Sequence, residues 1–257
     1  MASRGNLAGA YQAVGRLDQA IPLFEQNLED RTRILGPDHR DTLASRNNLA
    51  GACQAAGKLD QAIPLLQQTL DDSARLLGAH HPRTLTSRNN LAGAYQAAGR
   101  ISEAIPLFEQ ALTDHTYILG PHHPDTLNTR SNLAGAYQDA GRLNEAITLL
   151  EQNLEDSTHI LGPNHPDTLT SRNNLAYAYQ DSGRLNEAIT LLEQNLEDSI
   201  RVLGPNHPHT LISRDNLAGA YRAAGRIEDA EKLIETPSGS EDEQNDTEDN
   251  PDRETGD

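Results

Sequence analysis

The chain of 257 residues has no tryptophan, one cysteine, one methionine and only two phenylalanines. A single cysteine, Cys53, excludes an internal disulfide framework and any zinc site built from several cysteines. So few bulky side chains make one deep core a poor expectation. They are adequate for many small units that stack on one another.

Basic residues are also scarce, with 21 Lys and Arg against 38 Asp and Glu, which gives a net charge of −17. Residues 236–257 hold nine of the acids and a single base, so this tail carries nearly half of the net charge. Affinity for a phosphate backbone depends on Lys and Arg. We therefore expect no nucleic acid partner.

Long apolar runs are absent too. No stretch approaches the ~20 residues that cross a bilayer, and the opening residues, MASRGNLAGAYQAVG, lack the apolar core of a signal peptide. We expect a soluble, cytoplasmic protein with no membrane partner.

What the chain does have is an internal repeat of 42 residues. Four columns begin at Asn6, Leu7, Gly15 and Ala20 and return at every 42nd position as far as Asn216, Leu217, Gly225 and Ala230. Four unbroken columns at one spacing indicate a repeat architecture with six copies, over residues 1–235.

Each copy reads as two helices, as the third copy illustrates. Pro82 suits the first turn of a helix, and Gly99 suits its end. Apolar residues recur at helical spacing in both halves, which predicts helices of about 15 and about 18 residues. Ser102 is expected to cap the second helix. Its column reads Asp18, Asp60, Ser102, Asn144, Asn186 and Glu228.

These residues resemble the tetratricopeptide repeat. The family pattern W-x2-L-G-x2-Y, then A-x3-F, corresponds here to Arg88-x2-Leu91-Ala92-x2-Tyr95, then Ala104-x3-Phe108. The 42-residue period, with LGPxHPxT between copies, is similar to the kinesin light chain type of repeat. The resemblance covers 1–235 and implies a groove, lined by first helices, that binds peptides or partner domains.

We therefore expect an all-α, right-handed α-solenoid of about six antiparallel helix-turn-helix repeats over 1–235. The first copy lacks the start of its first helix, and the last has a short second helix. Ends without a polar cap make self-association an expectation. Residues 236–257 contain no apolar side chain and are expected to form a disordered acidic tail.

The resemblance also implies that an asparagine column faces the groove and hydrogen-bonds an extended ligand. An amide both donates and accepts, so it can bind a peptide bond without selecting a side chain. The alternative is that these amides bridge adjacent copies. The column contains Asn48, Asn90, Asn132, Asn174 and Asn216.

The same helical stripe continues with glycines and then polar residues. A glycine inside a helix costs about 1 kcal/mol relative to alanine, so either a ligand or the next helix is expected to come close there. Tyr177 replaces one of these glycines and is a candidate aromatic anchor. The stripe ends in Gln96, Gln138, Gln180 and Arg222, which complete the candidate partner-binding set.

Two further columns carry charge or imidazole. The arginine column could bind an acidic ligand, or it could pair with an aspartate column, and we favour pairing. These columns run from Arg4 to Arg214 and from Asp30 to Asp198. The histidines His39, His81, His123, His165 and His207 lie in the inter-repeat loops, where we expect helix capping and no metal.

Catalysis has little support, because candidate residues recur as scaffold columns whereas an active site would interrupt the repetition. We expect no enzyme activity and no cofactor. The predicted function is a protein–protein interaction scaffold that binds a protein or peptide ligand. The alternative is a regulatory sensor arm that works with a signalling ATPase supplied by another chain.

Overall fold

The computed structural model describes residues 2–235, which form twelve α-helices and no strand. The helices are α1 (Ala2–Ala13), α2 (Leu17–Leu35), α3 (Arg40–Ala55), α4 (Leu59–Leu77), α5 (Pro82–Ala97), α6 (Ile101–Leu119), α7 (Pro124–Asp139), α8 (Leu143–Leu161), α9 (Pro166–Asp181), α10 (Leu185–Leu203), α11 (Pro208–Ala223) and α12 (Ile227–Glu235). In complete copies the first helix has 16 residues and the second has 19, close to the expected lengths. The predicted tail, 236–257, lies outside the described residues.

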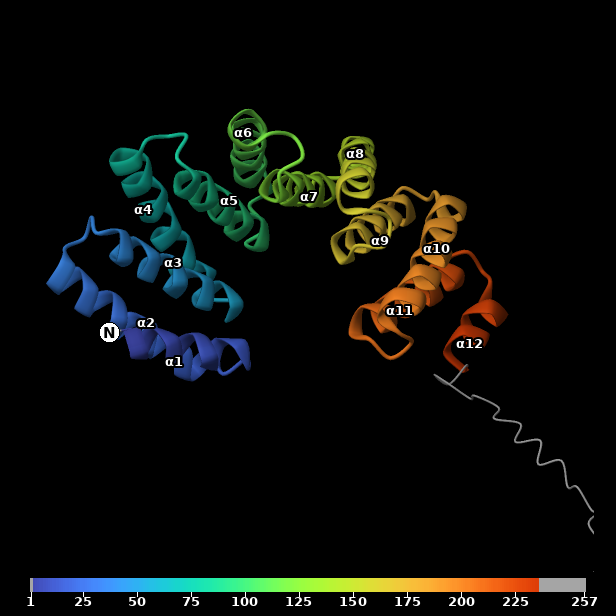
Figure 1. Cartoon of the computed structure of the whole chain (residues 1–257), viewed down its shortest axis with the longest axis horizontal. Coiled ribbons are helices and arrows are strands. Elements are labelled where there is room, and N and C mark those ends of the chain that lie inside the picture. Colours follow the sequence, from blue (N-terminus) through green and yellow to red (C-terminus); the bar gives the residue numbers. More distant parts are fainter. Residues whose placement is uncertain (1, 236–257) are drawn as a thin grey trace, which may run out of the picture.

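The helices stack in chain order, and each one packs against the next. The odd-numbered helices also contact one another directly from α5 to α11. Figure 1 shows an open arc in which the odd-numbered helices line the inner side and the even-numbered helices line the outer side. The predicted all-α solenoid of helix pairs is thereby confirmed.

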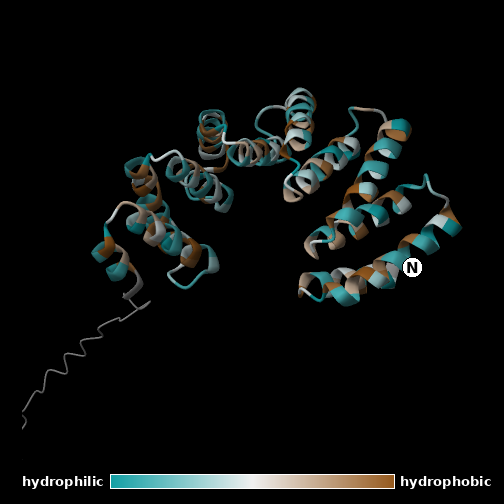
Figure 2. Cartoon of the chain, turned by 180° about the vertical axis from the view of Figure 1, so that it is seen from behind, coloured by the Kyte–Doolittle hydropathy of each residue, from teal (hydrophilic) through white to brown (hydrophobic). Residues whose placement is uncertain are grey.

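Small and medium apolar residues fill the interior. Ala92, Ala104 and Ala134 are fully buried, and such small side chains let neighbouring helices approach to about 8–10 Å. Phe108 and Leu150 occupy the same position in successive second helices and are also buried. Each helix alternates between apolar and polar stretches (Figure 2), and no described helix is long and apolar enough to cross a membrane.

Two glycines end the helices in each of the first five copies, and the sixth copy has the first of the two, Gly225. In the third copy Gly99 has φ of 71° and Gly120 has φ of 95°. Other residues are strained in this left-handed region, which explains why one column is glycine in all six copies and the other is glycine in the first five. They set the sharp reversal within a copy and the turn into the next one.

The start of the second helices corrects one prediction. The column of Ser102 does not cap these helices; it lies at the second helical position, and the N-cap is a basic residue such as Arg142. The guanidinium carbon of Arg142 lies 4.0 Å from the centre of the Tyr137 ring, and its Nε donates to Glu145 at 2.7 Å. Stacking and pairing hold this residue where a side-chain cap was expected.

This tyrosine–arginine clamp recurs in every described copy except the second. The clamps are Tyr11–Arg16, Tyr95–Arg100, Tyr137–Arg142, Tyr179–Arg184 and Tyr221–Arg226. In the last three copies the tyrosine hydroxyl also donates to a glutamate of the preceding second helix. The second copy has Cys53 and Lys58 instead, and Cys53 is buried, as its core column predicts.

The loop histidines cap the first helices. Nδ1 of His123 accepts a hydrogen bond from the backbone N–H of Asp125 at 3.2 Å. The other four members of the column do the same. A ring nitrogen that accepts must be unprotonated. The capping prediction is therefore confirmed.

Replacing His123 with alanine is expected to lower the free energy of unfolding by about 1 kcal/mol, the usual contribution of an N-cap. Asparagine also caps well, so His123→Asn is expected to retain most of that stability. Urea unfolding followed by circular dichroism measures both variants. Equal losses in the two variants would contradict the capping role.

Candidate partner-binding site

An ion pair joins the two helices in each of the first five copies, and it is largely buried in copies two to five. Arg130 on α7 donates to Asp156 on α8 at 2.6 Å, and their side chains are 4% and 14% exposed. The partners are 26 residues apart, and the pair recurs in the first five copies. The predicted pairing of these columns is confirmed. The five paired arginines therefore do not form a row of free anion receptors.

The other oxygen of each aspartate has a partner of its own. In the second copy Arg75 pairs with the aspartate of its own helix at 3.0 Å and with Asp38 of the preceding loop at 2.6 Å. The third copy has Tyr117 in place of this arginine. There the loop residue is His80, whose Nδ1 lies 3.4 Å from Asp114, and the fourth copy repeats this arrangement. The loop residue is thus acidic where the second helix carries Arg75, and it is a histidine where the second helix carries Tyr117.

The proton equilibrium of Asp198 follows from these contacts. Burial raises its pKa, but hydrogen bonds from Arg201 and Arg172 lower it by more, so the net pKa lies below the ordinary value. The stability that this carboxylate contributes is present above its unfolded pKa of about 3.9 and is lost as the pH falls through the lowered folded value.

Asparagines link neighbouring first helices. Nδ2 of Asn90 on α5 donates to Oδ1 of Asn47 on α3 at 3.0 Å. Asn132 on α7 makes the equivalent bond to Asn89, at 3.4 Å. Two of the five candidate asparagines, Asn90 and Asn132, therefore bridge adjacent copies. This is the alternative role that the sequence left open for the column.

Glutamines form a second row of such links. Nε2 of Gln96 donates to Asp139 at 2.7 Å, and Nε2 of Gln138 donates to Asp181 at 3.2 Å. Each bond joins one first helix to the next. Together the asparagine row, over α3, α5 and α7, and the glutamine row, over α5, α7 and α9, pair polar side chains of successive first helices.

Within the described residues, neither the asparagine row nor the glutamine row of hydrogen bonds continues from α9 to α11. Tyr177 on α9 is 61% exposed, and the buried Oδ1 of Asn173 accepts no hydrogen bond. Within 2–235 the remaining candidates have no hydrogen bond or ion pair of their own. They are Asn48, Asn174, Gln180, Asn216 and Arg222. Four of these five lie on α9 and α11, so this end of the array offers the most free polar groups.

The glycines of this stripe are open. A Cβ added to Gly51, Gly93 or Gly219 would meet no atom within 4 Å other than its own helix backbone and its chain neighbours. Gly135 meets only the amide of Gln96, at 3.5 Å. The expectation that the next helix packs closely here is wrong for these four glycines.

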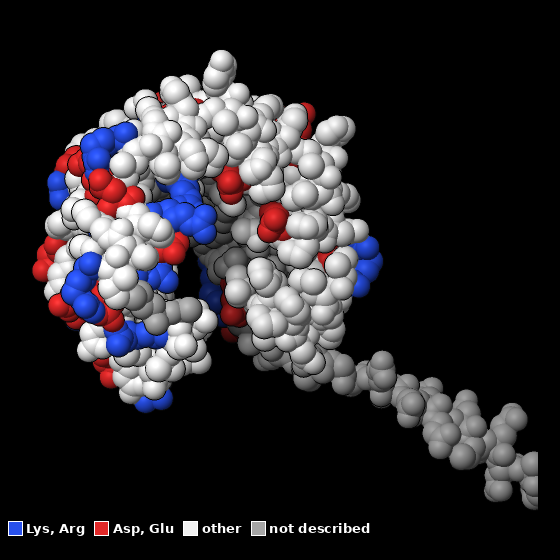
Figure 3. Space-filling model, turned by 60° about the vertical axis from the view of Figure 1, so that its left-hand side comes forward, with Lys and Arg blue, Asp and Glu red and all other residues white. Residues whose placement is uncertain are grey.

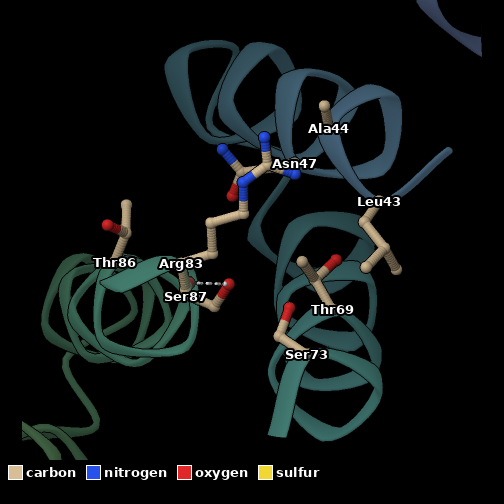
Figure 4. A pocket seen from close by; sticks show the side chains of 8 residues that line it. All are labelled: Leu43, Ala44, Asn47, Thr69, Ser73, Arg83, Thr86 and Ser87. Carbon is tan, nitrogen blue, oxygen red and sulfur yellow. Dashed lines mark hydrogen bonds between the residues drawn. The ribbon is translucent and has the colours of Figure 1, made fainter. Parts of the chain in front are cut away.

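Small pockets lie between successive first helices. One, of about 230 Å³, is lined by residues of α3, α4 and α5, among them Asn47 of α3 and Arg83 of α5 (Figure 4). The guanidinium of Arg83 makes no ion pair within the described chain. A second pocket, lined in part by Asn153 and Ser157, lies at the same place two copies later.

His115 occupies this place in the copy between them. It replaces the serine found at Ser73 and Ser157, is buried, and its Nδ1 lies 2.9 Å from Oγ1 of Thr129. One substitution thus places a buried imidazole at one junction between copies.

Sequence reasoning did not single out Asn47, Asn89 or Arg83. The two asparagines directly precede the predicted column, and a link between copies requires such an offset partner. Arg83 is the single base in a column that otherwise holds Asp41, Asp125, Asp167 and His209. This break in the column is the sequence signal that could have pointed to Arg83. Figure 3 shows that the array is hollowed and that basic side chains line part of the hollow.

Comparison with known protein families identifies the family of this repeat array. A tetratricopeptide repeat model matches residues 1–73, 47–114, 125–197 and 172–236, and a second such model matches 89–158. The chain belongs to the tetratricopeptide repeat family. No curated protein matches it in sequence.

Solved structures refine this assignment. A protein of Podosopora anserina assigned as a kinesin light chain, with nearly identical TPR-like repeats, is 38% identical, with a TM-score of 0.69 over 77% of this chain and 93% of that chain. BtubC (BKLC) of P. vanneervenii has a TM-score of 0.72 at 20% identity, over 93% and 96%. The tetratricopeptide repeat array is thus of the kinesin light chain-like type.

A signal transduction ATPase of Pyrococcus horikoshii, with a tetratricopeptide repeat sensor, has a TM-score of 0.68 at 15% identity. The match covers 90% of this chain and 34% of the ATPase. At this identity it shows a shared fold.

Arg130→Ala is expected to lower the free energy of unfolding by about 3 kcal/mol, because it leaves the largely buried Asp156 without its cation. Arg33 is an exposed arginine that bonds the other oxygen of Asp30, at 3.0 Å. Arg33→Ala is expected to cost much less, because exposed ion pairs contribute little to stability. Chemical denaturation of both variants tests the contrast. Similar losses would show that burial does not set the strength of the column.

His115 adds a pH-dependent term to stability. Burial lowers its pKa below the ordinary value, so near pH 6.5 the unfolded chain binds the proton more readily than the folded one. Stability therefore falls as the pH drops from about 6.5 toward the lowered folded pKa. His115→Ser is expected to remove this loss. An unchanged stability difference between wild type and variant, at about pH 7.5 and about pH 5.5, would contradict it.

Proposed function

We propose that this tetratricopeptide repeat array is a non-catalytic scaffold that binds a peptide or partner domain in the groove lined by its first helices. One observation carries the proposal. Hydrogen bonds within the polar stripe link α3, α5, α7 and α9, whereas the amides of Asn174, Gln180 and Asn216 on α9 and α11 are unpaired. Unpaired amides can donate to and accept from a peptide backbone. A groove formed before the ligand arrives also limits the entropy lost on binding.

Tyr177 gives this end of the groove an apolar contact. Its exposed ring presents a flat surface with few rotatable bonds, the kind of residue that anchors ligands at interfaces. Gly219 occupies the same column on α11 and has open space above it. A ligand backbone can come close to the helix at that glycine while a ligand side chain packs on the ring.

The other members of the candidate set extend the groove toward the N-terminus. Asn48 is free, whereas Asn90, Asn132, Gln96 and Gln138 must exchange an inter-repeat bond for one to the ligand. Exchange of one hydrogen bond for another yields little net energy. The strongest contributions are therefore expected at α9 and α11.

The lack of a reaction is supported by the roles of the candidate nucleophile and bases. Burial raises the pKa of the Cys53 thiol, which disfavours the reactive thiolate. The loop histidines use Nδ1 as helix caps. The alternative function, a sensor arm for an ATPase of another chain, has only the shared fold in its support.

Selection from a random peptide library displayed on phage tests the proposal, with the full chain as bait. In the groove variant Asn174→Ala, Tyr177→Gly, Asn216→Ala, each change removes an unpaired group, and Tyr177→Gly restores the residue of the other copies. Selected peptides are expected to bind this variant at least about tenfold more weakly, as expected when an aromatic anchor is lost. The melting temperature is expected to change little.

A matched control is Asn90→Ala with Gln96→Ala, which removes two side chains that already bond to adjacent first helices, Asn90 to α3 and Gln96 to α7. It is expected to change affinity by less than about threefold, since each lost ligand bond replaces an existing one. If no peptide is enriched, or if all variants bind selected peptides as wild type does, peptide binding in this groove is contradicted.

A further inference from the structure

The second pocket, here named the Asp167 pocket, lies between α7, α8 and α9 and has a volume of about 120 Å³. Part of its wall is apolar and consists of Leu127, Ile160 and Leu161. Sites for whole small molecules usually have volumes of about 300–1,000 Å³. A pocket of this size is therefore suited to a single side chain of a larger ligand.

A carboxylate stands at the rim of the pocket. The side chain of Asp167, in the first turn of α9, is 74% exposed. Nδ1 of His165 lies 3.7 Å from this carboxylate, but the same nitrogen accepts the backbone N–H of Asp167, so it carries no proton to neutralise the acid. His122 also lines the pocket, with its Nδ1 3.5 Å from Asp156. None of the described residues that line the pocket is a lysine or an arginine, so its negative charge is uncompensated.

The wall also holds a buried acceptor that lacks a donor. Asn153 on α8 is 2% exposed, and its Nδ2 donates to the hydroxyls of Ser131 and Ser171. Because the hydroxyl of Ser171 donates to the backbone carbonyl of Asp167, it can only accept from the amide, which fixes the orientation of Asn153. Oδ1 of Asn153 is left without a hydrogen bond. An unpaired buried acceptor is unfavourable, so a ligand that brings N–H donors is favoured here.

The pocket continues the groove of the first helices. Asn128 on α7 and Thr170 on α9 both line it, and they lie four residues before Asn132 and Asn174. Residues four apart share one face of a helix. The side chain of Asn128 has no hydrogen bond or ion pair within the described part of the chain. A ligand bound at Asn174 is thus within one helical turn of the pocket.

The equivalent pocket two copies earlier has the opposite charge. Arg83 occupies the column of Asp167 there and lines that pocket. Complementary charge attracts a ligand group, and like charge repels it. A basic group is therefore directed to the Asp167 pocket and away from its counterpart.

We propose that the Asp167 pocket binds the side chain of a lysine. The methylene groups of the lysine pack on the apolar wall, and its ammonium donates to Asp167 and to the amide oxygens. An ammonium has three donors and no acceptor, and it is more compact than the planar guanidinium of arginine. The source of the lysine, a peptide in the groove, rests on the proposed function, whereas the chemistry of the pocket can be tested without a peptide.

The butylammonium ion reproduces a lysine side chain and tests the pocket in the full chain. It is expected to shift the NMR signals of the Asn153 side-chain amide and of the Asp167 backbone N–H until they saturate, whereas neutral butan-1-ol is not. Asp167→Asn is expected to weaken this binding at least about tenfold, as the loss of a hydrogen bond between charged groups does. The matched control is Asp41→Asn, in the same column and beside the equivalent histidine cap of α3. It is expected to leave binding unchanged.

A peptide selected with the full chain extends the test to the ligand. Replacement of its lysine by methionine is expected to weaken binding to wild type about tenfold, but binding to Asp167→Asn by less than about twofold, because the two changes remove the same contact. Replacement by glutamate is expected to be tolerated better by Asp167→Arg, which carries the charge of Arg83, than by wild type.

The two measurements separate the pocket from the groove. Butylammonium that moves neither signal, or that binds Asp167→Asn as it binds wild type, would overturn the lysine pocket even if peptides bind. Peptides that bind without dependence on any lysine would overturn it as well. If butylammonium binds as expected but no peptide is enriched, the pocket is supported and the groove function fails.

Discussion

The buried arginine–aspartate pair is the interaction on which the rest of the solenoid depends. It sets how the two helices of a copy lie against each other, and it does so with side chains that are almost fully enclosed, as in Arg130 and Asp156. A solenoid accumulates the same small rotation at every copy, so a constant internal geometry is what makes a regular arc. The pair also withdraws arginines from the surface. In an acidic chain this leaves few free cations, among them Arg83, Arg214 and Arg222.

Around that constant unit the chain varies the side chains that contact neighbours. Where Arg75 is replaced by Tyr117, the loop supplies His80 instead of Asp38. Such compensation keeps the aspartate satisfied while it changes the local chemistry from a permanent charge to a titratable ring. In the same way, His115 replaces a serine at one junction between copies and buries an imidazole there. Repetition therefore builds the array, and departures from repetition distinguish one part of it from another.

Most of the fold could be predicted from the sequence because the signals are local or strictly periodic. The turn glycines, the histidine caps and the Arg–Asp columns each recur at one spacing, and the structure confirms them. The cap at Ser102 was wrong because Arg100 is held by Tyr95 and Glu103, a contact that helix propensity does not encode. The bond between Gln96 and Asp139 was missed because it joins different columns of adjacent copies. Which groove residues bind a partner depends on that pattern of internal satisfaction, so sequence columns alone could not rank them.

The tyrosine hydroxyls have a mechanical consequence. Tyr137, Tyr179 and Tyr221 each bond across to the preceding helix pair, whereas Tyr95 and Cys53 at the equivalent places do not. Asn27 and Arg31 of α2 still bond to α3, but within the described residues no side-chain hydrogen bond joins α4 to α5. In a quasi-linear array every junction bears the same load, and the one with the fewest cross-links yields first. Under tension the seam between α4 and α5 is therefore where the array parts, while the copies from α7 onward stay together as a stiffer rod.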